Sequence, residues 1–169
     1  MRAEERRQAI LEELRRSSRP VSAGYFAERF SVSRQVVVGD VALLRASGEN
    51  ISATPRGYVI LQASRGLLRQ VATRHDAAGM EAELNAVVDQ GCSVLDVIVD
   101  HPVYGQLTGP LQLSSRYDVS QFLARCTASD ARPLSDLTGG IHLHTLSCPD
   151  EAAFQRVRES LRALGVLLE

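Results

Sequence analysis

The stretch FSVSRQVVVGDVALLRASG, residues 30–48, decides the fold of the first third of the chain. Its tripeptide 31–33 predicts a tight turn, and Ser33 can cap a helix over the rest of the stretch. The residues just before it, 22–30, predict another helix that is capped by Ser22 and carries an apolar face. Two helices joined by so short a turn are typical of the helix-turn-helix motif.

The flanking residues complete a winged helix-turn-helix. Residues 3–16 carry apolar side chains among charges at helical spacing, which predicts a first helix. On the other side, β-prone runs at 51–54 and 58–61 enclose a Pro-Arg-Gly turn, as in a hairpin. Three helices and a hairpin in about 60 residues predict a winged helix over residues 1–62, followed by a linker up to the glycine at position 66.

The helix after the turn begins with polar residues, and this indicates a DNA-binding surface. In a helix-turn-helix the second helix enters the major groove with its N-terminal residues at the base edges. Arginine can read guanine and glutamine can read adenine, each through two hydrogen bonds. The predicted DNA-binding residues are Ser33, Arg34, Gln35 and Val38, with Arg56 at the hairpin tip against phosphate or in the minor groove. A unit that only mediates protein contacts is the alternative, but it has no need for Arg34 and Gln35 at this place.

The same helix also supplies much of the expected core of the motif. The predicted core residues are Val32, Val36, Val37, Val41 and Leu44. Gly39 interrupts the helix, where glycine costs about 0.5–1 kcal/mol relative to alanine. Close approach to the DNA backbone or to a neighbouring helix would explain this glycine, and the sequence does not choose between them.

Charge divides the chain at the same place. Residues 1–62 hold ten arginines against seven acidic residues, and residues 63–169 hold nine arginines against thirteen. A polyanionic partner is therefore favoured for the first part only, although the asymmetry is modest. The three widely spaced cysteines fit a reducing cytoplasm better than a disulfide framework. Since no apolar run approaches the roughly 20 residues of a membrane span, no membrane association is expected.

The second part of the chain alternates between strand and helix patterns. Strands are predicted at 67–73, 93–101, 109–115, 139–148 and 165–169, and helices at 76–91, 118–129 and 150–164. Asp118 is the expected cap of its helix. The order β-α-β-β-α-β-α-β predicts an α+β sandwich over residues 67–169, in which helices cover one face of an antiparallel or mixed sheet.

All four histidines fall in this second part, and two of them alternate along one predicted strand. Side chains two residues apart on a strand point to the same face, so His142 and His144 project together, as two metal ligands would. Two exposed polar residues on a solvated sheet face are the alternative interpretation.

His75 and the helix after it offer the rest of a possible metal site. Asp76 and Glu83 are seven residues apart and lie nearly on one stripe of that helix, over which His75 can fold. Glu81 and Asp76 compete with Glu83 as the oxygen donor, and spacing alone does not separate the glutamates. Three imidazoles and a carboxylate suit a borderline transition ion such as Zn²⁺, Ni²⁺ or Fe²⁺.

Four further residues are candidates for contacts to an effector. His101 and Tyr104 lie in the sequence DHPVYG at a strand end, where they could line a ligand pocket. His101 could equally satisfy only the turn by hydrogen bonds. Arg116 and Arg74 could each hold a carboxylate ligand, although a single arginine is usually a solvated surface residue.

The candidate metal site leaves two other functions open. A repressor that senses the metal ion itself is one of them. A metal-dependent enzyme is the other, with Glu81 or Asp100 as general base for a metal-bound water. The sequence contains no nucleophile motif, phosphate loop or glycine-rich cofactor signature, and the attached DNA-binding unit favours regulation over catalysis.

Taken together, these residues resemble the nicotinate-responsive transcriptional repressors, which join a winged helix-turn-helix to a three-histidine (3H) domain. The matching stretches are SVSRQVVVGDVALLRASG, ATPRGYVI, RHDAAGMEAELNAVVDQG, VDHPVYGQL and GGIHLHTL, in this order over nearly the whole chain. The resemblance implies a cytoplasmic, dimeric bacterial repressor of genes for NAD synthesis from nicotinic acid or for its uptake. Nicotinic acid would act as co-repressor on operator DNA.

The resemblance also implies a sensor domain with a fold like that of the phosphocarrier protein HPr and one divalent transition metal ion per chain. By motif position, the metal ligands would be His75, Glu83, His142 and His144. This favours Glu83 over Glu81, and it places His101, the remaining family histidine, near the effector. The family usually has a larger polar residue in place of Gly39, which leaves base specificity open.

Overall fold

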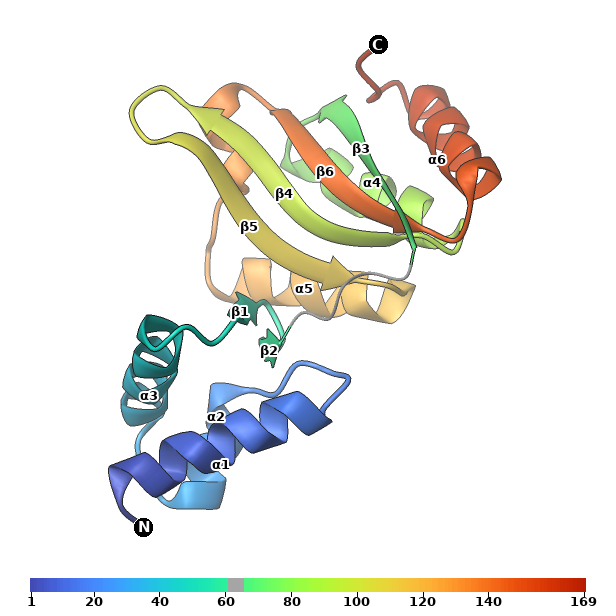
Figure 1. The fold of residues 1–169 in the computed structure, drawn as a ribbon. Coiled ribbons are helices and arrows are strands. Elements are labelled where there is room, and N and C mark those ends of the chain that lie inside the picture. Colours follow the sequence, from blue (N-terminus) through green and yellow to red (C-terminus); the bar gives the residue numbers. More distant parts are fainter. Residues whose placement is uncertain (61–65) are drawn as a thin grey trace. The chain divides into compact units, whose positions relative to one another are not determined.

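The computed structural model describes residues 1–60 and 66–169 of the chain (Figure 1). The chain divides into two compact units, Met1–Ala63 and Ser64–Glu169. The predicted linker falls almost entirely on residues outside the described ones, so the boundaries at residues 62 and 67 stay a prediction. Helices long and apolar enough to cross a membrane are absent from the described residues.

The first unit is the predicted helix-turn-helix with a small wing. Its helices are α1 (Ala3–Arg16), α2 (Ala23–Phe30) and α3 (Arg34–Ala46). The wing is an antiparallel pair, β1 (Ile51–Thr54) and β2 (Gly57–Ile60). Ser22 and Ser33 cap α2 and α3 as predicted, because their hydroxyl oxygens accept the backbone N–H of Tyr25 and Val36.

The core of this unit corrects one expectation. It is formed by Ile10, Leu11, Leu14, Ala23, Phe26, Val37, Val41, Leu44 and Ile51, with Val32 packed against it. Val36, expected in this core, is instead 38% exposed. Successive helical residues are rotated by about 100° around the axis. Because Val37 and Val41 face inward, Val36 lies at the margin of the buried stripe.

A buried ion pair ties α1 to α3. The carboxylate of Asp40 is 4% exposed and accepts hydrogen bonds from Arg6 Nε at 2.6 Å and from Arg6 Nη2 at 3.3 Å. Arg7 Nη1 approaches the same carboxylate at 3.7 Å. Asp40 also raises the pKa of Arg6 through their hydrogen bond. The polar position in the middle of α3 is therefore used for helix packing.

Replacing Asp40 by alanine should destabilise the first unit by about 3 kcal/mol, because Arg6 then stays half-buried without its partner. Urea unfolding followed by circular dichroism would measure the loss. The matched control is Glu28→Ala, which removes an exposed acidic side chain from α2. Equal unfolding midpoints for the two variants would show that the Asp40–Arg6 pair contributes no stability.

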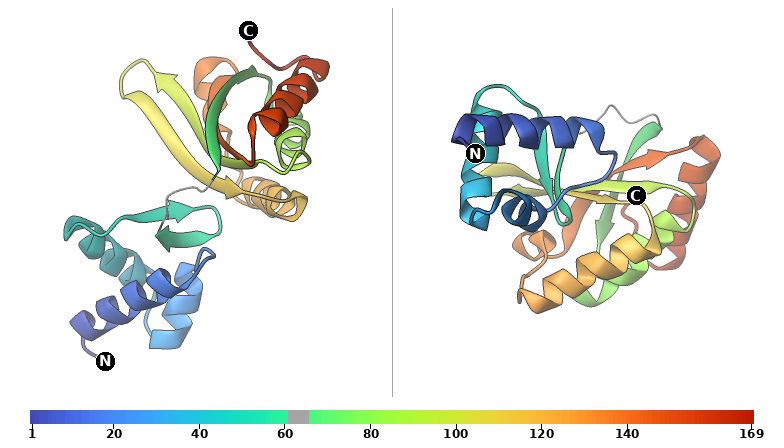
Figure 2. Two further views of the ribbon diagram at one scale, coloured as in Figure 1. Left: turned by 45° about the vertical axis from the view of Figure 1, so that its right-hand side comes forward. Right: turned by 90° about the horizontal axis from the view of Figure 1, so that it is seen from below.

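The second unit is a four-stranded sheet with helices on one face. The strands are β3 (Leu67–Arg74), β4 (Ser93–His101), β5 (Gly105–Leu113) and β6 (Ile141–Cys148), and the helices are α4 (Met80–Val88), α5 (Arg116–Ala128) and α6 (Glu151–Ala163). Two short 3₁₀ turns, η1 (Ala77–Gly79) and η2 (Leu134–Thr138), precede α4 and β6. The strand order is β3-β6-β4-β5, and every neighbouring pair is antiparallel. The predicted α+β sandwich is thus confirmed, and Figure 2 shows α4, α5 and α6 on the same side of the sheet.

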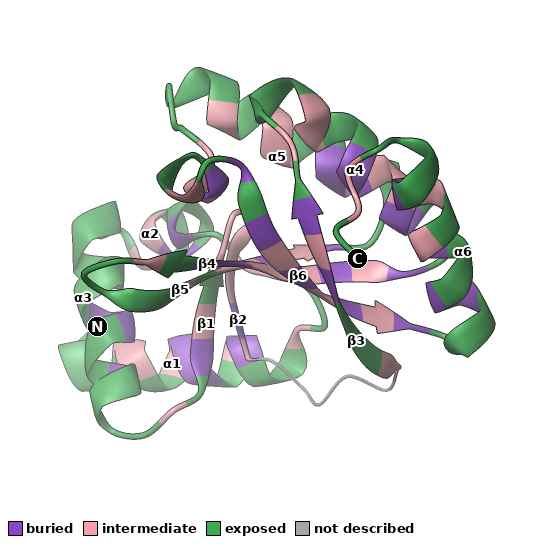
Figure 3. Cartoon of the chain, turned by 90° about the horizontal axis from the view of Figure 1, so that it is seen from above, coloured by how far each residue is buried: buried purple, intermediate pink, exposed green. Residues whose placement is uncertain are grey.

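The core of this unit lies between the sheet and its helices. Buried and more exposed residues alternate along β6, as Figure 3 shows by colour. The largest fully buried apolar side chains of the second unit come from both the helices and the strands, and they are Leu84, Leu113, Leu146, Leu161, Val87 and Val94. This packing holds the inward side of β6 against the layer of helices.

Three local predictions for this unit are corrected. Helix α5 is capped by the hydroxyl of Ser115, whereas Asp118 lies inside the helix and accepts the backbone N–H of Ser114. Strand β5 begins at Gly105, because the hairpin pairing with β4 continues to its end. The predicted final strand at 165–169 is reduced to a single bridge between Leu167 and Thr73.

Candidate functional site

Strand β6 carries two of the predicted metal ligands on its buried face. His142 and His144 are each 3% exposed, whereas Ile141 beside them is 46% exposed on the opposite face. Both imidazoles line a cavity together with residues of α4 and α5. The interpretation of two exposed polar residues on a solvated face is therefore wrong.

A bulge in the neighbouring strand β4 orients His144. The register between β4 and β6 shifts between Val94 and Ile98, and Asp96 lies within this shift. The carbonyl of Asp96 accepts a hydrogen bond from His144 Nδ1 at 2.6 Å, and its carboxylate accepts the N–H of Thr145 at 2.8 Å. Bulges commonly redirect side chains near functional sites, and this one fixes the ring of His144.

His75 and Glu83 reach the same place from the other side. His75 directly follows β3, and Glu83 lies in the first turn of α4 with 1% of its surface exposed. A side chain at Gly140 would come within 2.5 Å of the carbonyl oxygen of His75, so only glycine permits this approach. The competing donors are elsewhere, because Glu81 is exposed and Asp76 caps η1 through the N–H of Gly79.

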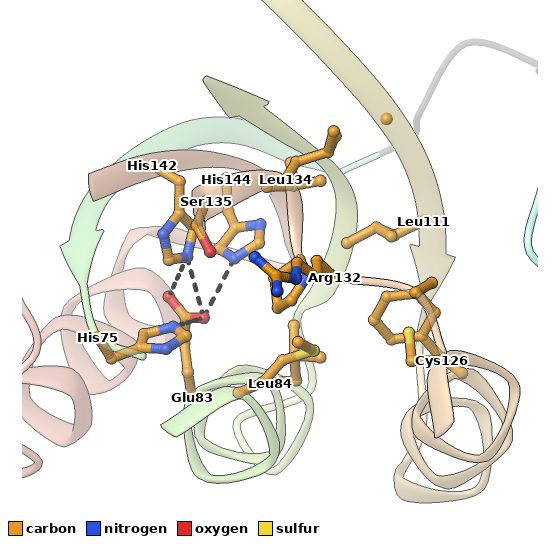
Figure 4. A pocket seen from close by; sticks show the side chains of 16 residues that line it. His75, Glu83, Leu84, Leu111, Cys126, Arg132, Leu134, Ser135, His142 and His144 are labelled. Atoms are coloured by element: carbon orange, nitrogen blue, oxygen red, sulfur yellow. Dashed lines mark hydrogen bonds and ion pairs between the residues drawn. The ribbon is translucent and has the colours of Figure 1, made fainter. Parts of the chain in front are cut away.

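The carboxylate of Glu83 lies among the three imidazoles (Figure 4). Its Oε2 atom is 2.5 Å from His75 Nε2 and 3.3 Å from His144 Nε2, and both of its oxygens are 3.2 Å from His142 Nε2. Thr73 donates its hydroxyl hydrogen to Oε1 at 2.5 Å. The ligand atoms of His75, Glu83 and His142 all lie within 4.8 Å of one another, so these residues could hold a metal ion.

The outer nitrogens of the rings support this interpretation. Nδ1 of His75, His142 and His144 lies 2.6, 2.8 and 2.6 Å from the carbonyl oxygen of Asp76, Gly140 and Asp96, respectively. A nitrogen that faces a carbonyl must carry the hydrogen, so in each neutral ring the lone pair is on Nε2. Three such lone pairs directed at a carboxylate repel it unless protons or a cation lie between them. Outer-shell bonds of this kind are typical of metal-ligating histidines.

The pKa values describe the same electrostatic balance. Burial alone would raise the pKa of Glu83, but hydrogen bonds from His142, His144 and His75 hold it well below its usual range. The hydrogen bond to Glu83 raises the pKa of His75. For His144, burial is the largest single effect and lowers the pKa, but the hydrogen bond and charge of Glu83 together with those of Asp96 raise it by more, so the net shift is upward. A divalent cation held by these residues would take the place of the protons between the imidazoles and the carboxylate, so its binding would release protons.

A cavity of about 220 Å³ adjoins this cluster. Its apolar walls are formed by Met80, Leu84, Val97, Leu111, Phe122 and Leu134. Its polar lining comes from the cluster at one end and from Arg132 and Ser135, which lie close to it in Figure 4. An apolar cavity with a few converging polar groups is the usual form of a small-molecule site.

The residues predicted to contact an effector do not line this cavity. His101 Nδ1 accepts the N–H groups of Val103 and Tyr104 at 3.1 and 3.2 Å, so it satisfies the turn between β4 and β5. Tyr104 is 76% exposed on that turn. Arg116 forms an ion pair with Asp89 at 2.6 Å. The structure therefore brings the four proposed metal ligands together and leaves His101, Tyr104 and Arg116 away from them.

Two cavity residues were missed by sequence reasoning. Arg132 and Ser135 belong to the connection between α5 and β6, which carries no helical or strand periodicity. The one available signal was an arginine directly before Pro133, in a short segment between two predicted elements. Only the folded chain shows that this segment faces the cavity.

The predicted DNA-binding residues lie at the start of α3 and in the wing. Ser33, Arg34 and Gln35 are exposed, and Val38 is 38% exposed. The side chains of Arg34 and Gln35 form no hydrogen bond with the described residues, whereas the hydroxyl of Ser33 caps α3. Arg56 follows β1 in the wing turn.

Gly39 has space around it. A Cβ atom at this position would meet nothing within 4 Å outside its own helix, so close packing against a neighbouring helix does not explain the glycine. Of the two explanations considered, approach to the DNA backbone stays a prediction.

Comparison with known proteins agrees with both units. A helix-turn-helix family model matches residues 6–59, and the 3H-domain family model matches residues 68–169. The chain is 44% identical to NiaR of Thermotoga maritima, described as a probable transcription repressor, over 98% of this chain and 95% of that protein. It is 39% identical to the transcription repressor NadR of Bacillus subtilis, over 97% and 93% of the two chains. Neither relative is described as an enzyme, and the chain belongs to the family of 3H-domain transcription repressors that includes NiaR and NadR.

Proposed function

We propose that this repressor controls genes for NAD synthesis or niacin uptake, with nicotinic acid as co-repressor and a divalent metal ion in the sensor domain. The observation that carries the proposal is the buried cluster of imidazoles and a carboxylate beside an apolar cavity. Its setting is a chain with a DNA-binding helix-turn-helix domain and repressors as relatives. The protein would act in the cytoplasm, where its operator DNA is.

The metal ligands in this proposal are His75, Glu83, His142 and His144. The donor set suits one Zn²⁺, Ni²⁺ or Fe²⁺ ion per chain, since borderline ions prefer imidazole nitrogen with some carboxylate. When bound, such an ion supplies a Lewis-acidic position for a carboxylate or ring nitrogen of the effector. The chain itself orients the imidazoles through three backbone carbonyls and excludes water by burial.

At the DNA, we propose a homodimer that places two copies of α3 in successive major grooves. Helix-turn-helix dimers read two half-sites that are one turn of DNA apart. Arg34 and Gln35 would read bases, whereas Ser33, Val38 and Arg56 would contact the adjacent backbone or base edges. Nicotinate would favour repression only if it binds this dimer arrangement better than the alternative arrangement.

Nicotinate should tighten the binding of metal-loaded protein to operator DNA by about 5- to 150-fold, the usual range of coupling between two sites. Fluorescence anisotropy of operator DNA with and without nicotinate would measure it. Nicotinamide serves as the matched control ligand, because it keeps the ring and lacks the charge. Equal affinities with and without nicotinate would rule out the co-repressor role. A switch produced by metal alone would instead support the metal-sensing alternative.

A further inference from the structure

The connection between α5 and β6 forms a continuous wall of the cavity beside the metal cluster. Five successive residues, 131–135, line it. The wall combines one guanidinium group, one hydroxyl group and the apolar side chains of Pro133 and Leu134. A segment with both polar and apolar side chains can bind the carboxylate of a small aromatic acid and also contact its ring.

Arg132 is distinctive among the residues that line this cavity. It is the only arginine there, and the described part of the chain gives its guanidinium no hydrogen bond or ion pair. Several other arginines of the same unit are paired, for example Arg69 with Glu151 at 3.0 Å and Arg116 with Asp89 at 2.6 Å. A cation beside an apolar cavity without an acidic partner is available for an anionic ligand.

Ser135 adds a second available polar group. The residue is 5% exposed, and its hydroxyl has no hydrogen-bond partner among the described residues. Its carbonyl is already engaged by the N–H of Gly140 at 2.8 Å, which fixes the backbone at this point. In Figure 4 the hydroxyl lies beside His142 and His144, at the metal end of the cavity.

We propose that Arg132 determines effector specificity by binding the carboxylate of a one-ring aromatic acid in this cavity. This inference rests on the proposed function and assigns its effector contact to a residue outside the predicted set. The apolar walls, Phe122 and Leu111 among them, contact the ring, and the Ser135 hydroxyl and the metal end receive the polar edge of the ring.

The chemistry favours an acid over its amide. A guanidinium binds a carboxylate through two parallel charge-assisted hydrogen bonds, and these are about twice as strong as neutral ones. A carboxamide has only its carbonyl oxygen as acceptor, and its NH2 group is a donor like the guanidinium. One of the two hydrogen bonds made to a carboxylate is therefore lost. A site that loses matched polar contacts discriminates strongly between close analogues. Arg132 therefore separates nicotinate from nicotinamide, and it does the same for other aromatic acid and amide pairs.

Calorimetric titration of the metal-loaded full-length chain tests the inference. The ligands are nicotinate, nicotinamide and benzoate, and the variants are Arg132→Gln, Arg132→Lys and Arg125→Gln. Arg125 is the matched control, because it is an exposed arginine of α5 that does not line the cavity. The wild-type chain should prefer nicotinate to nicotinamide. Arg132→Gln should weaken nicotinate binding by about tenfold or more and abolish this preference, because a charge-assisted pair is lost.

The other outcomes separate this inference from the proposed function. Arg132→Lys should recover part of the affinity as a point charge, and metal content should be unchanged in all variants. If Arg132→Gln binds nicotinate as tightly as the wild type, or loses metal, the inference is wrong and the proposed function stands. If Arg125→Gln weakens binding equally, the effect is not specific to the cavity and the inference is also wrong. If the wild-type chain binds neither acid, both are wrong.

Discussion

Replacing His142 and His144 together by alanine should reduce the metal content of the purified protein from about one divalent ion per chain to almost none. Each change removes a nitrogen ligand whose ring is already oriented by a backbone carbonyl. Changes to outer-shell partners alone cost metal affinity by about 10- to 100-fold, so loss of two ligands should exceed that range. Inductively coupled plasma mass spectrometry after dialysis against the metal-free buffer would measure the content.

Two control variants make this result specific. His101→Ala removes the one histidine that lies outside the cluster, and Glu81→Gln removes the glutamate that competes with Glu83 by sequence position. Both should keep their metal, whereas Glu83→Gln should lose much of it. Circular dichroism would establish that each variant is folded. An unchanged metal content in the double histidine variant would show that the proposed ligand set is wrong.

Loss of the metal should also appear in thermal stability. A ligand that binds only the folded state at 100 times its dissociation constant adds about 2.7 kcal/mol. Added Zn²⁺ or Ni²⁺ should therefore raise the melting temperature of the wild-type chain and of His101→Ala. The double histidine variant should show no such rise, and nicotinate should no longer tighten its binding to operator DNA.

Replacing both Arg34 and Gln35 by alanine should reduce operator affinity by several hundred-fold or more in a dimer. A bidentate contact from arginine to guanine or from glutamine to adenine is worth about 1–3 kcal/mol of discrimination, and a dimer makes each contact twice. Both side chains are exposed at the start of α3 and make no hydrogen bond with the described residues, so their removal leaves the fold intact. Fluorescence anisotropy with operator and scrambled DNA would measure the effect.

The scrambled DNA distinguishes base reading from charge. Arg16→Ala is the matched control, because it removes one exposed arginine at the end of α1, away from the start of α3. It should change binding to both DNAs only slightly and equally, since the loss of one positive charge acts on any DNA sequence alike. Variants at Arg34 and Gln35 should instead lose most of the preference for the operator. A preserved preference would place the base-reading residues elsewhere.

The helix-turn-helix was predictable because its signals are local. Ser22 and Ser33 cap their helices through groups only three residues away, and apolar spacing marks the buried stripe of each helix. The error at Val36 arose at the edge of that stripe, where pattern alone does not distinguish an inward from a flanking position. The packing role of Asp40 could not be predicted from local sequence, because its ion-pair partner Arg6 lies 34 positions away.

The candidate site was predictable only where strand geometry or family resemblance supplied it. Alternation along one strand placed His142 and His144 on the same face. The choice of Glu83 came from the resemblance, and the structure now shows Glu83 buried and Glu81 exposed. The cavity could not be predicted from the sequence, because its wall at 131–135 faces residues of elements that are distant along the chain. Tertiary packing, rather than any periodic pattern, brings these groups together.

The short path from Arg132 to Gly140 has a consequence for how signals would combine. Arg132 and Gly140 are joined by η2, and the carbonyl of Gly140 holds the outer nitrogen of His142. An acid bound to Arg132 would stabilise the segment that orients the metal ligand His142. By thermodynamic linkage, if the acid raises the affinity for the metal, the metal raises the affinity for the acid by the same factor. Such a sensor would respond only when both ligands are present. If nicotinate and the metal act as proposed, nicotinate should raise the affinity of the chain for the metal in competition with a chelator, and a metal-starved cell should leave its operators unoccupied even when nicotinate is plentiful.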